Sequence, residues 1–461
     1  MIHRRDATGR LCRQWHHANK TMKPNHTSIV SLKRTTGVLA LVLTFVLAGC
    51  SSEIHLADTP NLYVAAGAAD PFERVPEAWR TNQVRILYAT DRVAEPTKDG
   101  RREFGYARSM AMEFGHVTVD MGKNLSWDQL VADSRSSQRS GDIPMKVSNV
   151  TMLGQFPESN RPPVIVDGQP EDPPEVRAAV VQITKTLHAT LRESLSHTKR
   201  KEVFVYVHGY NNTFDSAAIR MATLWHFLGR EGVPVIYTWP AGSGGILRGY
   251  NYDRESGEFT IFHLKEFLTA LADCPEVEKV NIISHSRGTD VTVTALRELN
   301  LEHKSKVGGA GKRMKLGSLV LAAPDLDWEV FNQRVLAERL GGLVQNFTVY
   351  VSNNDKALAL SDWLYQGGAR LGRLMTTNVK PEWQETLKHL NHRAAIVDVK
   401  ANTNFLGHAY FVESPEVLSD LILMLRDNRA PGAENGRPMQ HREDGFWEIH
   451  NGYPNTSPEK K

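Results

Sequence analysis

The stretch Val280-Asn281-Ile282-Ile283-Ser284-His285-Ser286-Arg287-Gly288 joins a short β-branched run to the pattern small-x-Ser-x-Gly. This pattern is typical of a nucleophile elbow, where a buried strand turns sharply into a helix and holds a serine hydroxyl on the turn. The turn is tight, so its flanking residues must be small. Gly288 fits, whereas Ser284 stands where glycine is usual. Ser286 is therefore the candidate nucleophile, although a plain turn serine would give the same short pattern.

Continuous apolar segments alternate with segments of helical periodicity on both sides of this stretch. We expect strands at 84–90, 116–121, 203–207, 233–239, 318–323, 347–352 and 395–399, with the elbow strand at the start of the quoted stretch. We expect helices at 176–195, 214–228, 261–271, 328–340 and 417–425, and a helix after the elbow that carries Val291, Ala295, Leu296 and Leu299. Strands that are apolar throughout and separated by helices indicate a mostly parallel sheet with helices on both faces. Residues 302–315 read as a surface loop, and residues 240–260 as a flap over the site.

Two carboxylates follow predicted strand ends after the serine. A serine hydroxyl needs a base, usually histidine, that is oriented by a carboxylate. Where a serine sits on such an elbow, the acid and then the histidine follow it along the chain. Asp325 follows strand 318–323 and Asp355 follows strand 347–352. Asp355 is preferred because it lies one strand before the histidine, and it also suits the N-cap of a helix.

His408 is the candidate base. It lies in Gly407-His408-Ala409, after the last predicted strand and before the last helix. Ligands of parallel sheets bind beyond the carboxyl ends of the strands, and a histidine in this loop reaches that edge. His389 and His392 precede the strand and so belong to the opposite edge, while His285 is expected to point away from the site or to shape the turn.

The oxyanion of the transition state needs preorganised donors. His208-Gly209-Tyr210 follows the apolar strand at 203–207, where the backbone amide of Tyr210 is the first candidate donor. The amide of Arg287, directly after the nucleophile, is the second candidate donor.

The roles of two other features stay open. The pair Asp91-Arg92 is read as a solvated strand end, with a loop-holding or substrate-binding role as the alternative, and Trp239 as either core or acyl pocket.

Several of these segments together resemble one bacterial family of α/β-hydrolases, described as esterase- or lipase-like and otherwise poorly characterised. The resembling segments are Tyr88-Ala89-Thr90-Asp91-Arg92, Val207-His208-Gly209-Tyr210-Asn211-Asn212, Thr238-Trp239-Pro240, the elbow, Ala323-Pro324-Asp325, Val351-Ser352-Asn353-Asn354-Asp355 and Gly407-His408-Ala409-Tyr410-Phe411. The resemblance spans about residues 84–425 and implies an α/β-hydrolase fold with a triad of Ser286, Asp355 and His408. It does not supply the substrate.

The N-terminus resembles the signal sequence of a bacterial lipoprotein. Lys33-Arg34 precede an apolar run from Val38 to Leu47 that is too short to span a bilayer as a mature helix. The run ends in Leu47-Ala48-Gly49-Cys50, which resembles a lipobox, so Cys50 is expected to carry lipid and to hold the chain on the membrane. Ser51 then favours the outer membrane, facing the periplasm. An ordinary signal peptide with a chance cysteine is the alternative, and Met22 would give a leader of more usual length.

Charge and cysteine content exclude several functions. The chain has 461 residues and a net charge of +3; residues 1–49 contribute +7, which leaves −4 for the rest. A mildly acidic body argues against nucleic-acid binding. Besides Cys12 in the leader and Cys50, Cys274 stands alone, so we expect neither a disulfide framework nor a cysteine metal cluster. Spaced His, Asp and Glu ligands are also lacking, so no metal or organic cofactor is predicted.

The sequence thus predicts a serine hydrolase that cleaves a small-molecule ester or lipid through an acyl-enzyme. We expect a signal peptide at 1–49, a tether at 50–80, a hydrolase domain at 81–427 and a mobile polar tail at 428–461. Two alternatives remain. The acyl group could pass to an acceptor other than water, or the chain could be a non-catalytic envelope lipoprotein that uses this scaffold to bind a partner.

Overall fold

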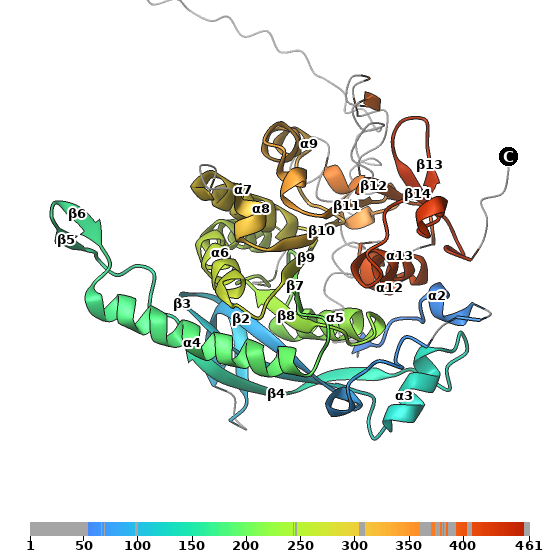
Figure 1. The fold of residues 1–461 in the computed structure, drawn as a ribbon, viewed down its shortest axis with the longest axis horizontal. Helices are drawn as coiled ribbons and strands as arrows, with labels where there is room; N and C mark the ends of the chain where they lie inside the picture. Colours follow the sequence, from blue (N-terminus) through green and yellow to red (C-terminus); the bar gives the residue numbers. More distant parts are fainter. Residues whose placement is uncertain are drawn as a thin grey trace, which may run out of the picture. The chain divides into compact units, whose positions relative to one another are not determined.

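The computed structural model describes residues 54–455 except 66, 69, 97–99, 243, 245–246, 304–308, 359–369, 374–378, 380, 382–383, 386–392 and 403–407. Its strands are β1 (Ile54–His55), β2 (Gln83–Pro96), β3 (Arg102–Met121), β4 (Pro144–Gln155), β5 (Val164–Val166), β6 (Gln169–Glu171), β7 (Glu202–Val207), β8 (Val233–Thr238), β9 (Lys279–His285), β10 (Leu316–Ala322), β11 (Asn346–Val351), β12 (Ala394–Val399), β13 (Gln440–His441) and β14 (Trp447–Ile449). Within these residues, twelve strands form one sheet in the order β1-β4-β3-β2-β8-β7-β9-β10-β11-β12-β14-β13, and β5 pairs with β6 (Figure 1).

Most of this sheet is parallel, as expected from the sequence. Pairing is parallel from β2 through to β14 in the order given. Antiparallel strands lie only at the two edges among the described residues, with β3, β4 and β1 at one edge and β13 at the other. The carboxyl ends of the parallel strands therefore share one edge of the sheet, and the candidate site is expected there.

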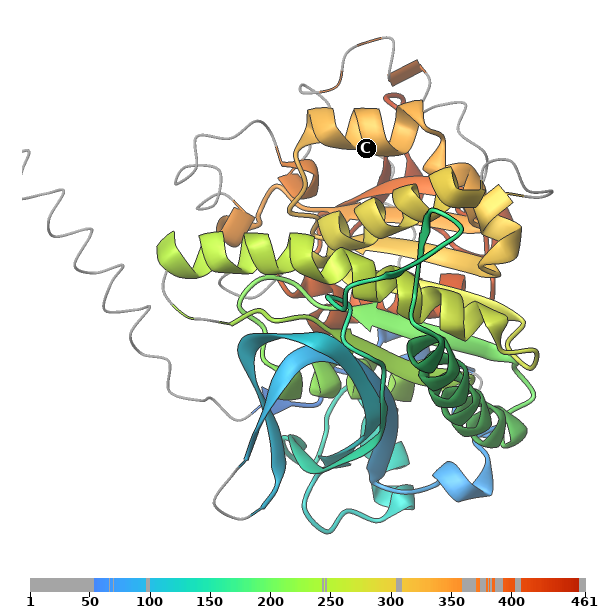
Figure 2. The ribbon, with the colours of Figure 1, turned by 90° about the vertical axis from the view of Figure 1, so that its left-hand side faces the viewer.

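Helices cover both faces of the sheet (Figures 1 and 2). They are α2 (Asn61–Val64), α3 (Trp127–Ser134), α4 (Pro174–Ser196), α5 (Phe214–Phe227), α6 (Leu247–Asp273), α7 (Gly288–His303), α8 (Gly309–Arg313), α9 (Trp328–Phe331), α12 (Tyr410–Glu413) and α13 (Pro415–Leu425). Strand β7 shows why its sequence is apolar throughout. Val203 and Val205 pack in one core with α4, α6 and α7, while Phe204 and Tyr206 pack in the other with α5 and α13. A two-sided fold of this kind was the expectation, and it is confirmed.

The antiparallel edge is larger than the sequence indicated. Strand β3 begins at Arg102, well before the expected start at residue 116, and no strand was expected where β4 lies. The sequence did not indicate β4 because an edge strand exposes much of its length, so half of its pattern is hydrophilic. The expected tether is also too long. Strand β1 already pairs with β4, and Tyr63 and Phe72 are buried.

Three further expectations about local structure are wrong. Residues 247–260 begin the long helix α6 instead of forming a flap. The expected surface loop at 302–315 contains the end of α7 and the short helix α8, while the helix expected at 328–340 is α-helical only in α9 and continues as a π-helical segment. None of the helices in the described residues is sufficiently long and apolar to traverse a bilayer.

Residues 428–455 are not a mobile tail. Strand β14 extends the sheet by pairing in parallel with β12, and Phe446 and Ile449 are buried. Arg437 is 1% exposed and donates from Nη2 to Oδ2 of Asp420 at 2.6 Å, and from Nε to Oδ1 at 2.8 Å. The Tyr453 hydroxyl also donates to Asp420, at 2.7 Å. The segment looks polar in the sequence, although its arginine is paired inside the fold.

Replacing Arg437 with methionine should lower the free energy of unfolding by about 3–5 kcal/mol, because Asp420 would stay buried without its cation. Urea denaturation of the purified protein measures the change. Arg85→Met is the matched control. The Arg85 side chain is 50% exposed in its ion pair with Glu193, and a pair of this kind contributes less than about 1 kcal/mol. Equal small losses in both variants would contradict the structural role of Arg437.

Candidate active site

The elbow between β9 and α7 has the strained geometry that its sequence predicts. Ser286 adopts a φ of +53°, which is unusual for a residue other than glycine, and its N–H donates to the Ala322 carbonyl at 3.0 Å. A Cβ on Gly288 would lie 2.3 Å from the carbonyl oxygen of His208, so only glycine fits there. The tight packing of the turn against the loop after β7 fixes the position of the serine hydroxyl.

Ser284 explains how the elbow tolerates a departure from the usual glycine. The residue is fully buried, and its hydroxyl lies 2.7 Å from Oγ1 of Thr292, one turn into α7. A buried hydroxyl costs little when it is hydrogen-bonded, so a serine is accommodated at this position. The hydroxyl also ties the strand side of the turn to the helix side.

The structure brings Ser286, His408 and Asp355 together in one hydrogen-bonded chain. Nε2 of His408 lies 2.9 Å from Oγ of Ser286, and Nδ1 lies 2.7 Å from Oδ2 of Asp355. Asp355 is 1% exposed, whereas the His408 side chain is 20% exposed. Because a carboxylate only accepts, Nδ1 carries the proton and Nε2 is left to accept from the serine hydroxyl. Oδ1 of Asp355 also accepts from the Leu358 N–H at the start of the following helical turn, so one carboxylate makes both the contact to His408 and the cap.

Asp325, the alternative acid, has other partners. Its Oδ2 accepts from the Tyr250 hydroxyl at 3.1 Å, and its Oδ1 lies 3.5 Å from Nε of Arg370. Its backbone N–H donates to the carbonyl of Ser286 at 3.2 Å, so it supports the elbow from behind. The two aspartates occupy equivalent strand ends, but only the Asp355 carboxylate is bonded to His408.

His285 positions the loop that carries His408, a role that sequence reasoning missed. Its Nε2 lies 3.1 Å from the carbonyl oxygen of His408, which can only accept, so Nε2–H is the donor. The His285 ring also stacks on Phe411 at 4.6 Å. Burial holds the pKa of His285 well below its ordinary value, so the ring is neutral. The sequence offered one signal, since this histidine directly precedes the candidate nucleophile.

The loop with the first oxyanion candidate, Tyr210, lies against the nucleophile. A Cβ on Gly209 would come within 2.5 Å of Cβ of Ser286, so the backbone approaches the hydroxyl as closely as glycine permits. The second candidate, the amide of Arg287, follows Ser286 at the entrance to α7. The guanidinium of Arg287 forms an ion pair with Asp290 at 2.8 Å, so the side chain has a contact that is separate from the candidate backbone donor.

Arg92 holds the same loop, and the reading of Asp91-Arg92 as a solvated strand end is wrong. Both residues are buried. The Arg92 guanidinium donates to the carbonyls of Asn212 at 2.7 Å and of Ala241 at 2.8 Å, and it lies 3.3 Å from Nε2 of His208. Burial lowers the pKa of Arg92 to about 10, so the group stays charged at neutral pH. The sequence placed Arg92 directly after the strand expected at 84–90, whereas β2 continues to Pro96 and carries Arg92 within it.

Trp239 belongs to the core. It is fully buried, stacks on His208 at 5.2 Å, and donates from Nε1 to the His208 carbonyl at 2.7 Å. These contacts brace the start of the loop that carries Tyr210. The residue therefore contributes to the site by rigidity, and the alternative of an acyl pocket is not supported by its contacts.

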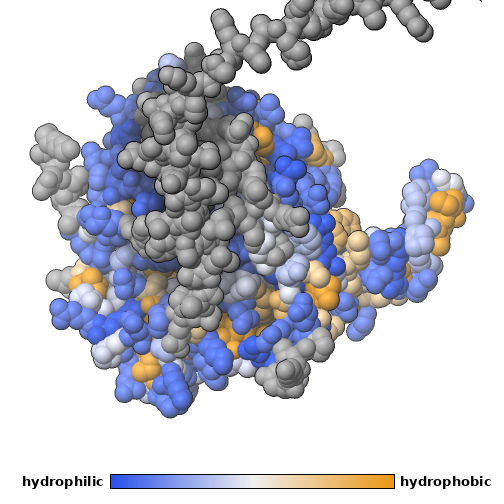
Figure 3. All heavy atoms as spheres, turned by 180° about the vertical axis from the view of Figure 1, so that it is seen from behind, coloured by the Kyte–Doolittle hydropathy of each residue, from blue (hydrophilic) through white to orange (hydrophobic). Residues whose placement is uncertain are grey.

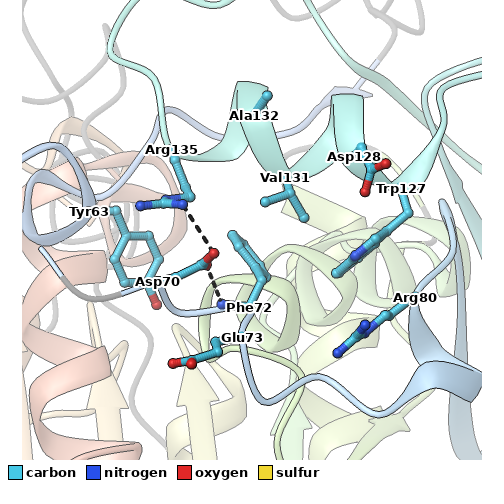
Figure 4. A pocket seen from close by; sticks show the side chains of 10 residues that line it. All are labelled: Tyr63, Asp70, Phe72, Glu73, Arg80, Trp127, Asp128, Val131, Ala132 and Arg135. Carbon is cyan, nitrogen blue, oxygen red and sulfur yellow. Dashed lines mark hydrogen bonds and ion pairs between the residues drawn. The ribbon is translucent and has the colours of Figure 1, made fainter.

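A cavity of about 620 Å³ lies elsewhere in the fold, between α3 and the segment after α2 (Figure 4). Asp70 accepts from Arg135 across it at 3.1 Å, and Phe72 and Trp127 form part of its wall. Neither Ser286, His408 nor Asp355 lines this cavity.

Among the described residues, His, Cys, Asp and Glu side chains form no group of three or more that could hold a metal ion. Cys50, His389 and His392 lie outside the described residues.

Comparison with known proteins agrees with this architecture. A family model described as "Alpha/beta hydrolase of unknown function (DUF900)" matches residues 183–426, more than half of the chain. No curated protein matches the chain. The match includes the elbow and the strand ends that carry Ser286, Asp355 and His408. The chain therefore belongs to this family of α/β-hydrolases of unknown function, as its sequence resemblance implied.

Proposed function

We propose that the protein is a serine hydrolase that cleaves carboxylic esters through an acyl-enzyme on Ser286. The observation that carries the proposal is the use of both His408 ring nitrogens, one toward Ser286 and one toward Asp355. A loop histidine without a catalytic role would need neither a buried carboxylate at Nδ1 nor a serine hydroxyl at Nε2. This constellation is the one that activates a serine for acyl transfer.

Each residue has one role in the proposed reaction. His408 Nε2 takes the hydroxyl proton as Ser286 Oγ bonds to the ester carbonyl carbon, and Asp355 stabilises the resulting imidazolium. The tetrahedral oxyanion accepts from the amides of Tyr210 and Arg287. His408 then protonates the departing alkoxide, which leaves as alcohol and yields the acyl-enzyme. Water, deprotonated by the same histidine, attacks the acyl carbon and releases the carboxylic acid and free serine. This route uses no metal or organic cofactor.

A fluorophosphonate probe tests the proposal, because it forms a stable adduct only with an activated serine. We expect labelling of the native protein, loss of labelling after heat denaturation, and an adduct that peptide mass spectrometry places on Ser286. The neighbouring Ser284 in the same peptide is an internal control, since its buried hydroxyl is bonded to Thr292. An adduct elsewhere, or no adduct under conditions that label a known serine esterase, would contradict the proposal.

We also propose that the chain is lipidated at Cys50 and held on the outer membrane, facing the periplasm. The support is the sequence around residues 33–51, with a basic start, a short apolar run and a lipobox-like end. The mass of the N-terminal peptide of the mature protein reports the lipid directly.

A further inference from the structure

The hairpin of β5 and β6 exposes an unusual apolar surface. Val164, Ile165 and Val166 pair with the β6 strand through a two-residue turn at Asp167 and Gly168, both with positive φ. All residues of both strands are exposed, and Ile165 reaches 69%. Apolar residues gather at the tip of this projection, which extends beyond the start of α4 (Figures 1 and 3).

Water is a poor environment for this hairpin. A strand with one solvated face alternates apolar and polar residues, whereas β5 is apolar on both faces. An isolated two-stranded hairpin is only marginally stable in water, and this one has three residues in each strand and no buried residue in either. Its sequence and conformation therefore suit a surrounding that is apolar on both sides of the strand. A lipid bilayer provides such a surrounding, whereas a flat protein surface would cover only one side.

The chain before the fold is short enough to keep the hairpin near a membrane. Strand β1 begins at Ile54, four residues after Cys50. Four residues reach at most about 14 Å, so lipid on Cys50 would hold β1 close to the bilayer surface. β1 pairs with the first two residues of β4, and the hairpin follows the other end of that strand. At about 3.3 Å per residue, β4 spans roughly 40 Å along the edge of the sheet.

We propose that the β5–β6 hairpin inserts into the membrane, so that the chain is attached at both ends of β4. This inference rests on the proposed lipid at Cys50, because that lipid is the reason to prefer a bilayer over a second copy or another protein as the surrounding of the hairpin. Asp167 and Glu171 give the hairpin negative charge, and the Glu171 carboxylate is paired with Arg177 at 2.8 Å. Insertion is therefore driven by apolar burial and not by attraction to anionic headgroups, so it should persist at high salt and in zwitterionic lipid.

A fluorescent probe at the hairpin tests this attachment. Ile165→Cys in the full chain is labelled with an environment-sensitive dye and reconstituted into phosphatidylethanolamine–phosphatidylcholine vesicles. Some of the lipid carries a quencher near the headgroup–acyl boundary, where interfacial segments lie about 5–10 Å deep. Cys274 is fully buried and burial raises the pKa of its thiol to about 11, so it does not compete for the dye. The parent chain, treated in the same way, corrects for background labelling.

We expect blue-shifted emission from the label at residue 165 and strong quenching by the lipid-borne quencher, both unchanged in high salt. The matched control is Leu301→Cys on α7, an apolar residue that is 48% exposed and should stay unquenched. An unshifted label would overturn the proposal. A shifted label without lipid quenching would also overturn it, because the hairpin would then be covered by a second copy or another protein. Turnover of p-nitrophenyl butyrate in the same vesicles and the mass of the Cys50 peptide report separately on the proposed activity and on the anchor.

Discussion

Replacing Ser286 with alanine should lower kcat for p-nitrophenyl butyrate by about 10⁴- to 10⁶-fold. The variant removes only the hydroxyl that lies 2.9 Å from Nε2 of His408, and with it the acyl-enzyme route. The residual rate would come from substrate binding and the oxyanion donors, which are backbone groups and stay in place. Initial rates under saturating ester measure the effect, with active-site concentration taken from fluorophosphonate titration of the wild type.

Ser284→Ala is the control for this experiment. It removes a hydroxyl two residues away, within the same turn, that is bonded to Thr292 and not to His408. We expect kcat to change by no more than a few fold, with a small loss of stability from the lost hydrogen bond, about 1 kcal/mol. The thermal midpoint of Ser286→Ala should stay close to that of the wild type, because alanine meets the same positive φ. Unchanged turnover in Ser286→Ala would refute the proposed nucleophile.

Asp355→Asn should lower kcat by about 10³- to 10⁴-fold with little effect on KM. An asparagine can present its NH₂ group to Nδ1, which then loses its proton to Nε2, so that Nε2 no longer accepts from Ser286. It also removes the negative charge that stabilises the imidazolium. The effect is therefore on the transition state and appears in kcat, measured by the same ester assay.

Asp325→Asn provides the matched comparison, since both aspartates are buried and follow neighbouring parallel strands. The Asp325 carboxylate contacts Tyr250 and Arg370, so we expect its removal to lower kcat less than about tenfold, through the support it gives to the elbow. The reverse order of effects, with Asp325→Asn inactive and Asp355→Asn near the wild-type rate, would show that the acid is misassigned.

The central part of the fold could be predicted because each element carries its own signal. The strands at 203–207, 233–239 and 347–352 are buried on both faces, so they read as unbroken apolar runs. The elbow is equally local, because the turn itself demands small residues around Ser286. The edges of the sheet carry no such signal. Strand β4 is solvated along much of its length, and the C-terminal segment is rich in charge.

The C-terminal segment shows what sequence patterns leave out. Its polarity predicts a solvated tail when each residue is considered alone. Arg437 is buried nonetheless, because Asp420 on α13 supplies the opposite charge from a different part of the chain. Arg92 is a similar case, since two of the three carbonyls that accept from its guanidinium, those of Asn212 and Ala241, lie more than a hundred residues away. A charge that is paired only in the folded state looks like a surface charge in the sequence.

By itself the sequence determined the parallel sheet, the elbow, and a short set of side chains at the carboxyl ends of the strands. It favoured Asp355 over Asp325 by chain order alone and assigned no partner to His285. Only the tertiary structure decided that His408 lies against Asp355 and that His285 holds the His408 loop. The physical reason is one of range. Secondary structure follows from neighbours along the chain, whereas hydrogen bonds between loops depend on how packed strands and helices place distant residues within about 3 Å of each other.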